Sequence, residues 1–85
     1  MNRFIILIII INLSFACVSP DSYFSTGEEF YELKEYEKAI EYYSEAIKLK
    51  PDFAEAFRKR GASKCKLKRY DEAIIDFDSE LKINT

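Results

Sequence analysis

The sequence predicts an all-α fold: two helix-turn-helix hairpins, making four antiparallel helices, form an α-solenoid fragment after an N-terminal signal segment. The first observation behind this prediction is an internal repeat, because residues 33–40 (LKEYEKAI) return 34 positions later as residues 67–74 (LKRYDEAI). The second is a helix-favouring composition, with two Gly and two Pro in 85 residues. The third is the three-and-four spacing of apolar residues within each unit. A fixed period of this length indicates a helical hairpin that is copied once.

The start of the chain has the pattern of an export signal. Arg3 gives a positively charged beginning, and residues 4–11 form an unbroken apolar run. Ser14 and Ala16 then supply the small residues of a cleavage site. A membrane-spanning helix needs about 20 apolar residues, and this stretch is shorter. We therefore expect residues 1–16 to be a removable signal peptide, with an uncleaved anchor as the alternative.

Cys17 follows the expected cleavage site directly. A Cys at this place resembles the lipobox of bacterial lipoproteins, in which the thiol is diacylated and becomes the new N-terminus. The sequence departs from that pattern at Ser14, where Leu is usual, so ordinary cleavage to a soluble exported form is the alternative. The resemblance implies a protein of the bacterial cell envelope, either a membrane-anchored lipoprotein or a periplasmic or secreted protein. More than one acyl chain on Cys17 would hold it firmly to a bilayer.

The residues expected for the first repeat are 20–52. Ser19 is placed to cap a first helix, with Pro20 at its first position. A second helix carries its apolar residues on one face, and these are Tyr36, Ala39, Ile40, Tyr43, Ala46 and Ile47. Pro51 is expected to end that helix, because proline lacks an amide hydrogen.

The residues expected for the second repeat are 53–85. The spacing Asp52-x-x-Glu55 predicts a capping box at the start of a third helix. The fourth helix is expected from about Tyr70 to Ile83. The only two Gly residues, Gly27 and Gly61, occupy equivalent positions of the two repeats. Gly inside a helix costs about 1 kcal/mol relative to Ala, so we expect these two to allow close approach of paired helices.

From about residue 20 to the C-terminus, these units resemble a pair of tetratricopeptide (TPR) repeats. The residues that carry the repeat signature are Gly27, Tyr36, Ala39, Tyr43, Ala46, Pro51, Gly61, Tyr70, Ala73 and Phe77. Thr26 and Arg60 depart from the family pattern, which prefers Leu, and Lys64 replaces a preferred Tyr. Lys64 therefore makes the packing of the third helix uncertain. Acidic residues at 76, 78 and 80 predict an outer helix that is polar because nothing stacks on it.

The resemblance implies a protein-protein interaction module whose partner lies in a concave groove lined by the first helix of each repeat. The corresponding positions are Phe24, Glu28, Tyr31, Arg58, Ala62 and Cys65. They do not match the Lys and Asn pattern of the carboxylate-clamp members of the family. For Phe24 and Tyr31, ordinary core packing is an equal alternative, since two repeats barely form a groove.

The net charge of −2 conceals a basic segment between acidic neighbours. Residues 57–70 hold seven cations and no acid: Arg58, Lys59, Arg60, Lys64, Lys66, Lys68 and Arg69. This basic patch could pair with Glu28, Glu32 and Glu35, could face anionic lipid headgroups, or could be an ordinary solvated helix face. Nucleic acid is not expected as a partner, because no aromatic platform accompanies the cations.

Catalysis is not expected. The chain has no His, no Gly-rich phosphate loop and no plausible nucleophile constellation, so we expect no enzyme activity, no metal and no other cofactor. Cys65 is expected to be a small buried apolar residue. A bridge from Cys17 to Cys65 requires that Cys17 is not acylated and that the compartment is oxidising.

Three interpretations of the function remain open at this stage. The first is an exported, lipid-anchored adaptor or scaffold that binds another protein and reaches the membrane through its anchor or an uncleaved signal. The second is a structural protein whose repeats self-associate into homo-oligomers, because three or more repeats are normally needed for stability. The third is a truncated remnant of a longer array of repeats.

Overall fold

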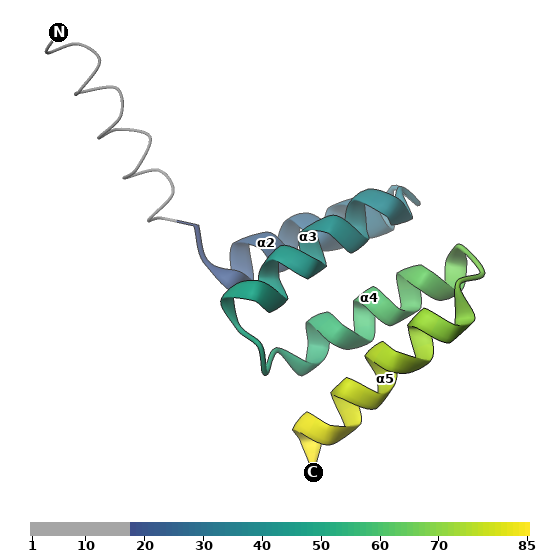
Figure 1. Ribbon diagram of the computed structural model, residues 1–85. Coiled ribbons are helices and arrows are strands. Elements are labelled where there is room, and N and C mark those ends of the chain that lie inside the picture. The colour runs from purple at the N-terminus through teal and green to yellow at the C-terminus, as the bar shows by residue number, and fades with distance from the viewer. Residues whose placement is uncertain (1–17) are drawn as a thin grey trace, which may run out of the picture.

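The computed structural model describes residues 18–85. The expected signal segment and Cys17 lie outside the described residues, so both stay predictions. The described part contains helices α2 (Pro20–Glu32), α3 (Tyr36–Leu49), α4 (Ala54–Lys66) and α5 (Tyr70–Asn84), and it contains no strand (Figure 1). The predicted all-α fold of four helices is confirmed.

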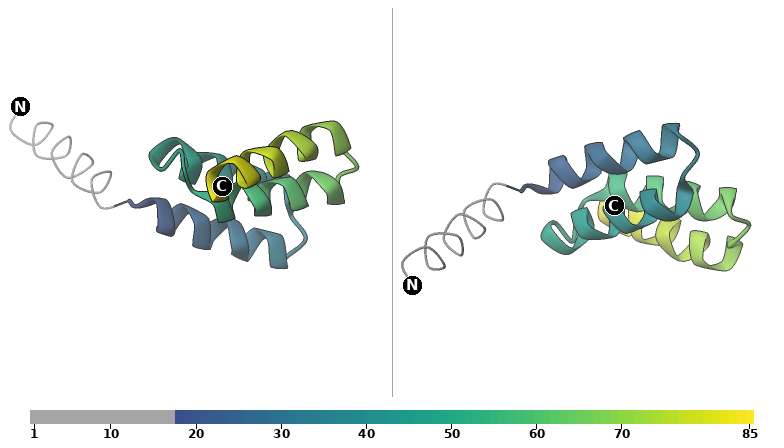
Figure 2. Two further views of the ribbon diagram at one scale, coloured as in Figure 1. Left: turned by 90° about the horizontal axis from the view of Figure 1, so that it is seen from below. Right: turned by 90° about the horizontal axis from the view of Figure 1, so that it is seen from above.

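The helices form two antiparallel hairpins that lie side by side (Figures 1 and 2). Helix α3 packs against both α2 and α4, and α5 packs against α4. Helices α4 and α5 each begin 34 residues after their counterparts α2 and α3. The sequence repeat therefore corresponds to a repeat of structure, with α2 and α4 on one side of the molecule and α3 and α5 on the other.

In each hairpin, an aromatic ring of the second helix packs directly on a glycine of the first helix. A Cβ atom built on Gly27 would stand 2.7 Å from Cδ1 of Tyr43, and one built on Gly61 would stand 2.7 Å from Cε1 of Phe77. Neither glycine has a positive φ, so conformational freedom does not explain them. The expected close approach is confirmed, and the atoms that approach are the ring atoms of the following helix.

The two hairpins share a small apolar core. Ala46 and Ala56 are fully buried and Phe53 is 8% exposed, so the contact between α3 and α4 is built from two small residues and one ring. Phe24 of α2 reaches this core, with its ring centroid 5.0 Å from that of Phe53. The predicted inner face of α3 is confirmed, because Tyr43 is also fully buried.

The first helix begins as the sequence predicts, and the third does not. The amide of Ser22 donates to Oγ of Ser19 at 3.1 Å, as expected of an N-cap. The predicted capping box is wrong, because α4 begins at Ala54 after Phe53 and receives no side-chain cap. Phe53 is buried between the hairpins, which fixes where the chain enters α4 and leaves Asp52 exposed in the preceding turn.

The same turn follows α2 and α4. Lys34 and Lys68 have φ values of 62° and 63°, in the left-handed region. The Lys34 amide donates to the carbonyl of Tyr31 and the next amide to that of Phe30, which is the Schellman pattern of a helix C-terminus. The second hairpin repeats both bonds. A lysine in this conformation carries strain that a glycine would not.

We expect Lys34→Gly to stabilise the protein by about 0.5–1 kcal/mol. A left-handed conformation costs an L-residue roughly 1–2 kcal/mol, and the greater freedom of Gly in the unfolded chain offsets part of the gain. Urea unfolding followed by circular dichroism measures the change. The matched control is Lys38→Gly, inside α3, which should destabilise by about 1 kcal/mol. Equal losses in the two variants would contradict the strain at Lys34.

Candidate functional site

The face formed by α2 and α4 carries the residues that the sequence suggested for a groove. Phe24 is half-buried, and its ring lies 5.5 Å from that of Tyr43, so it is part of the core as well as of this face. Tyr31 lies edge-on against Tyr36, with ring centroids 5.4 Å apart. These are the two positions for which core packing was the alternative interpretation, and both do pack intramolecularly.

Glu28 of α2 contacts both α3 and α4. One carboxylate oxygen accepts a hydrogen bond from the Tyr43 hydroxyl at 2.5 Å and lies 3.5 Å from Nζ of Lys59. The ammonium of Lys59 also lies 4.5 Å from the ring centroid of Tyr31. A polar cluster of Glu28, Tyr31 and Lys59 therefore joins α2 to α4 across the boundary between the hairpins.

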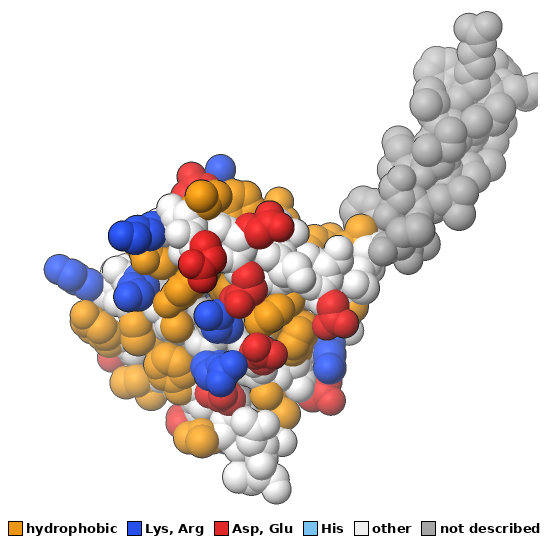
Figure 3. Space-filling model, turned by 180° about the vertical axis from the view of Figure 1, so that it is seen from behind, with side chains coloured by type: hydrophobic (Ala, Val, Ile, Leu, Met, Phe, Trp, Pro, Cys, Tyr) orange, Lys and Arg blue, Asp and Glu red, His pale blue; other side chains and the backbone are white. Residues whose placement is uncertain are grey.

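The remaining suggested groove residues lie on α4. Arg58 pairs with Glu55 at 3.5 Å and with Glu80 of α5 at 3.8 Å. Ala62 and Cys65 are partly exposed, and Cys65 is a free thiol within the described residues. Figure 3 looks onto the side on which α2 and α4 lie, and it shows acidic, basic and apolar side chains mixed over this surface. The role of these residues in binding stays a prediction.

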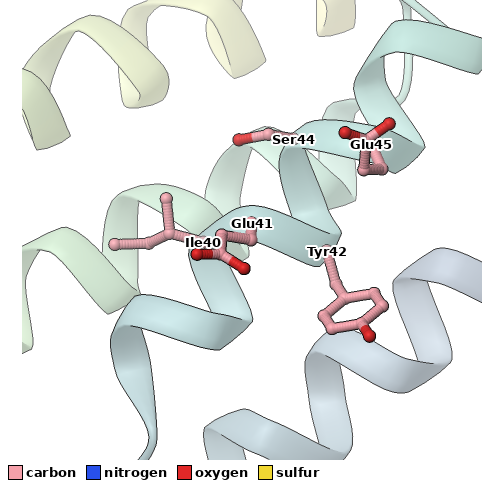
Figure 4. A pocket seen from close by; sticks show the side chains of 5 residues that line it. All are labelled: Ile40, Glu41, Tyr42, Ser44 and Glu45. Carbon is pink, nitrogen blue, oxygen red and sulfur yellow. The ribbon is translucent and has the colours of Figure 1, made fainter.

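A cavity lies elsewhere, on α3. Its volume is about 490 Å³, and its lining residues are Ile40, Glu41, Tyr42, Ser44 and Glu45 (Figure 4). None of the suggested groove residues lines it. Nothing in the sequence pattern predicted this cavity, because Glu41 and Glu45 have the spacing of an ordinary solvated helix face.

Most cations of the basic segment have acidic partners. Arg58, Lys59, Arg60, Lys64 and Arg69 each contact a carboxylate, and the partner of Arg69 is Glu37. The predicted pairing with Glu28 is confirmed for Lys59. Lys66 and Lys68 are exposed and make no ion pair within residues 18–85. Intramolecular pairing is thus the main use of this segment in the described structure.

One of these ion pairs is buried. Asp76 of α5 is 1% exposed, and its carboxylate accepts two hydrogen bonds from Arg60, at 2.7 and 3.0 Å. Nζ of Lys64 lies 2.9 Å from the same carboxylate. Arg60 also donates to Oγ of Ser44 at 3.0 Å, which ties α4 to α3. The expectation that Asp76 belongs to a polar outer face is wrong, since two cations on α4 draw this carboxylate inward.

The first hairpin fills the equivalent space with aromatic rings. Positions 34 residues before Lys64 and Asp76 are occupied by Phe30 and Tyr42, whose rings stack at 5.3 Å and 20°. Tyr23 adds a third ring, 6.2 Å from Tyr42. Lys64 therefore does not disturb the packing of α4, because its charge is compensated where the first hairpin has an aromatic stack. The 34-residue offset between these pairs was the sequence signal that could have revealed this exchange.

The hydroxyl of Tyr43 is held in its neutral form. Burial of the phenol raises its pKa far above the usual value, and the hydrogen bond to Glu28 and the charge of that carboxylate add to the effect. The hydroxyl therefore stays a hydrogen-bond donor to Glu28 at any physiological pH. This bond fixes the side chain of Glu28 on the α2–α4 face.

The described residues show no sign of two other kinds of site. Between residues 18 and 85 there is no group of His, Cys, Asp and Glu side chains placed to hold a metal ion. In the same part of the chain, no helix has the length and apolar character needed to cross a bilayer.

Comparison with known proteins finds similarity to one repeat family. Residues 27–67 match the family model described as TPR repeat. The chain is similar to small glutamine-rich tetratricopeptide repeat-containing protein 2 of Saccharomyces cerevisiae, with 43% identity over 51 residues, which is 60% of this chain and 15% of that protein. It is also similar to the UDP-N-acetylglucosamine–peptide N-acetylglucosaminyltransferase of Giardia intestinalis, with 34% identity over 64 residues, which is 67% of this chain and 4% of that enzyme.

The chain therefore spans less than a sixth of either relative. The match to the transferase concerns a small part of its length, so its named activity is not carried over to this chain. The family match, the similar repeat protein and the helical hairpins together support a TPR protein.

We expect Asp76→Asn to destabilise the protein by about 2–4 kcal/mol. The change leaves Arg60 and Lys64 largely buried without a counter-charge, and their partial exposure keeps the loss below that of a fully buried pair. Thermal unfolding followed by circular dichroism measures it.

The matched control replaces the whole cluster by the residues of the first hairpin. Arg60→Thr, Lys64→Phe and Asp76→Tyr together should leave stability within about 1 kcal/mol of the wild type, because a buried ion pair is often no better than apolar packing of similar volume. An Asp76→Asn variant as stable as the wild type would show that the buried carboxylate is not needed.

Proposed function

We propose that this TPR protein is an adaptor of the bacterial cell envelope that binds a protein partner on its α2–α4 face. TPR repeats imply a protein-protein interaction module. The single observation that favours this face is the polar cluster of Glu28, Tyr31 and Lys59, which crosses from one hairpin to the other. A partner lying across the cluster would contact both hairpins at once.

The charges around this cluster suggest what the partner presents. Glu32 is exposed one turn after Glu28 on α2, and Lys66 is exposed two turns after Lys59 on α4. Within the mixed charges of this face, Glu28 and Glu32 thus place acids on α2, and Lys59 and Lys66 place cations on α4. Such an arrangement suits a partner segment that carries charges of both signs, because complementary charges fix register and orientation.

Reversal of these exposed charges tests the proposal. The immobilised protein should recover a stoichiometric partner from detergent extracts of the cells that express it. Glu32→Lys combined with Lys66→Glu should weaken that recovery at least tenfold, since the exposed acid of α2 and the exposed cation of α4 both reverse their charge while Glu28, Lys59 and the buried contacts are kept. The matched control is Glu72→Lys, an exposed acid of α5 on the other side of the molecule. Recovery of no stoichiometric partner, or equal losses in both variants, would contradict binding at this face.

The envelope location rests on the residues before the described part. The apolar run 4–11, the small residues Ser14 and Ala16, and Cys17 support export with lipid attached to the thiol. The lipid would hold the adaptor to a membrane while its α2–α4 face binds the partner. Periplasmic or secreted release after ordinary cleavage is the alternative.

Intact mass of the protein purified from a bacterial membrane fraction tests this part. We expect a loss of residues 1–16 and an added mass that corresponds to acyl chains on Cys17. A Cys17→Ser variant is the control and should lose the added mass and leave the membrane fraction. A wild-type protein that retains Met1 would refute both cleavage and acylation.

A further inference from the structure

Helix α5 has an apolar face that nothing covers within residues 18–85. Tyr70, Ile74 and Leu81 are 57%, 57% and 62% exposed, and they recur at helical spacing along one side of α5. Ile75 beside them is 65% exposed. Figure 1 shows α5 at the edge of the molecule, with α4 as its neighbour. Tyr70, Ile74 and Leu81 define the α5 face, and among residues 18–85 no other helix has as many large apolar side chains exposed as α5.

The first hairpin shows how such a face is covered. The residues 34 positions earlier than Tyr70, Ile74 and Leu81 are Tyr36, Ile40 and Ile47, and Ile47 packs against the core that Phe53 and Ala56 share with α3. All three are partly buried. Helix α4 covers α3 with an apolar anchor, Phe53, and a small residue, Ala56, that lets the helices approach. The structure thus contains its own example of a helix docked on the equivalent surface.

Charge also distinguishes the α5 face from its counterpart. On α3, Ser44 accepts a hydrogen bond from Arg60 of the covering helix, and Glu37 pairs with Arg69 in the turn that follows this helix. The equivalent residues of α5 are Asp78 and Asp71, both exposed. Two carboxylates therefore stand where cations of a covering helix would arrive. Aspartate at the position of Ser44 increases the preference for a basic helix.

A second copy of this chain does not provide that helix. The α2 positions that correspond to Phe53, Ala56 and Arg60 are Ser19, Ser22 and Thr26, which offer neither an apolar anchor nor a cation. Two α5 faces placed together would bring Asp71 and Asp78 of both copies near one another, and Lys82, the exposed cation of α5, offsets only part of that repulsion. Anionic lipid is disfavoured for the same reason.

We propose that the α5 face binds a basic amphipathic helix of a partner protein, docked on α5 as α4 is docked on α3. The partner helix carries a bulky apolar residue, a small residue three positions later and a cation four positions after that, the spacing of Phe53, Ala56 and Arg60. This is a second surface, distinct from the α2–α4 face. It shares with the proposed function only the premise that the protein binds other proteins.

The test uses a labelled peptide that copies residues 52–69, with Cys65→Ser to prevent oxidation, and the full chain in nanodiscs of neutral phosphatidylcholine. Fluorescence anisotropy should show saturable binding. Ile74→Ser combined with Leu81→Ser should weaken it at least tenfold, while Leu49→Ser, which changes an exposed apolar residue outside the face, should leave it unchanged. Circular dichroism checks that each variant keeps its helix content.

A charge exchange tests the orientation. Asp78→Lys in the protein should weaken binding about fivefold, and an Arg60→Glu change in the peptide should restore most of the loss. Light scattering and competition by phosphatidylglycerol vesicles test the other occupants. A dimer abolished by Ile74→Ser with Leu81→Ser, or displacement of the peptide by the vesicles, would overturn the proposal in favour of a second copy or of lipid.

The remaining outcomes separate this proposal from the adaptor function. Absence of peptide binding to the wild type, or equal binding to the Ile74→Ser, Leu81→Ser variant, overturns the α5 proposal and leaves the α2–α4 face untouched. Glu32→Lys with Lys66→Glu should not change peptide binding. Retained peptide binding together with no partner on the α2–α4 face would overturn the proposed function alone.

Discussion

The contact on which the structure depends is an aromatic ring lying on a glycine of the preceding helix. In the first hairpin Tyr43 lies on Gly27, and in the second Phe77 lies on Gly61, at positions that differ by the 34-residue period. The ring needs the space of the missing Cβ, so the glycine sets the distance between the two helices. In the first hairpin the same ring bears the hydroxyl that holds Glu28 in place. The core contact and the candidate binding face are therefore built from one side chain.

A second contact between the paired helices, at equivalent positions of the two hairpins, is made by different kinds of side chain. Phe30 and Tyr42 stack in the first, whereas Lys64 and Arg60 bind the buried Asp76 in the second. Aromatic packing is stabilised by the removal of apolar surface from water. The ion cluster loses the hydration of its charges, and hydrogen bonds between Asp76 and the two cations compensate for that loss. The ion cluster adds one feature that the rings lack, because Arg60 also reaches Ser44 and so joins the second hairpin to the first. The repeat is conserved in geometry and varied in chemistry.

The two ends of the described array are unlike. Helix α2 presents Ser19, Ser22 and Thr26 where α4 presents Phe53, Ala56 and Arg60, so its outer side needs no cover. Helix α5 presents apolar residues where α3 is covered by α4. The α2 end of the described array is therefore polar, whereas the α5 end exposes apolar side chains. Together with the α2–α4 face, this gives the molecule two surfaces of different character, one of mixed charge and one apolar with acidic flanks.

The sequence by itself determined the helices, their 34-residue period and the role of the two glycines, because these follow from local spacing and from a pattern that is written twice. It also gave the N-cap at Ser19, which depends on neighbouring residues alone. The start of α4, the burial of Asp76 and the cavity on α3 were decided by the tertiary structure. In each case the outcome depends on residues of another helix. Phe53 is buried because it packs against Ala46 of α3. Asp76 can be buried as a carboxylate because the fold places Arg60, 16 positions earlier, within hydrogen-bond distance of it. For the same reason the sequence assigned Asp76 to a solvated face and did not show that the exposed side of α5 is its apolar side.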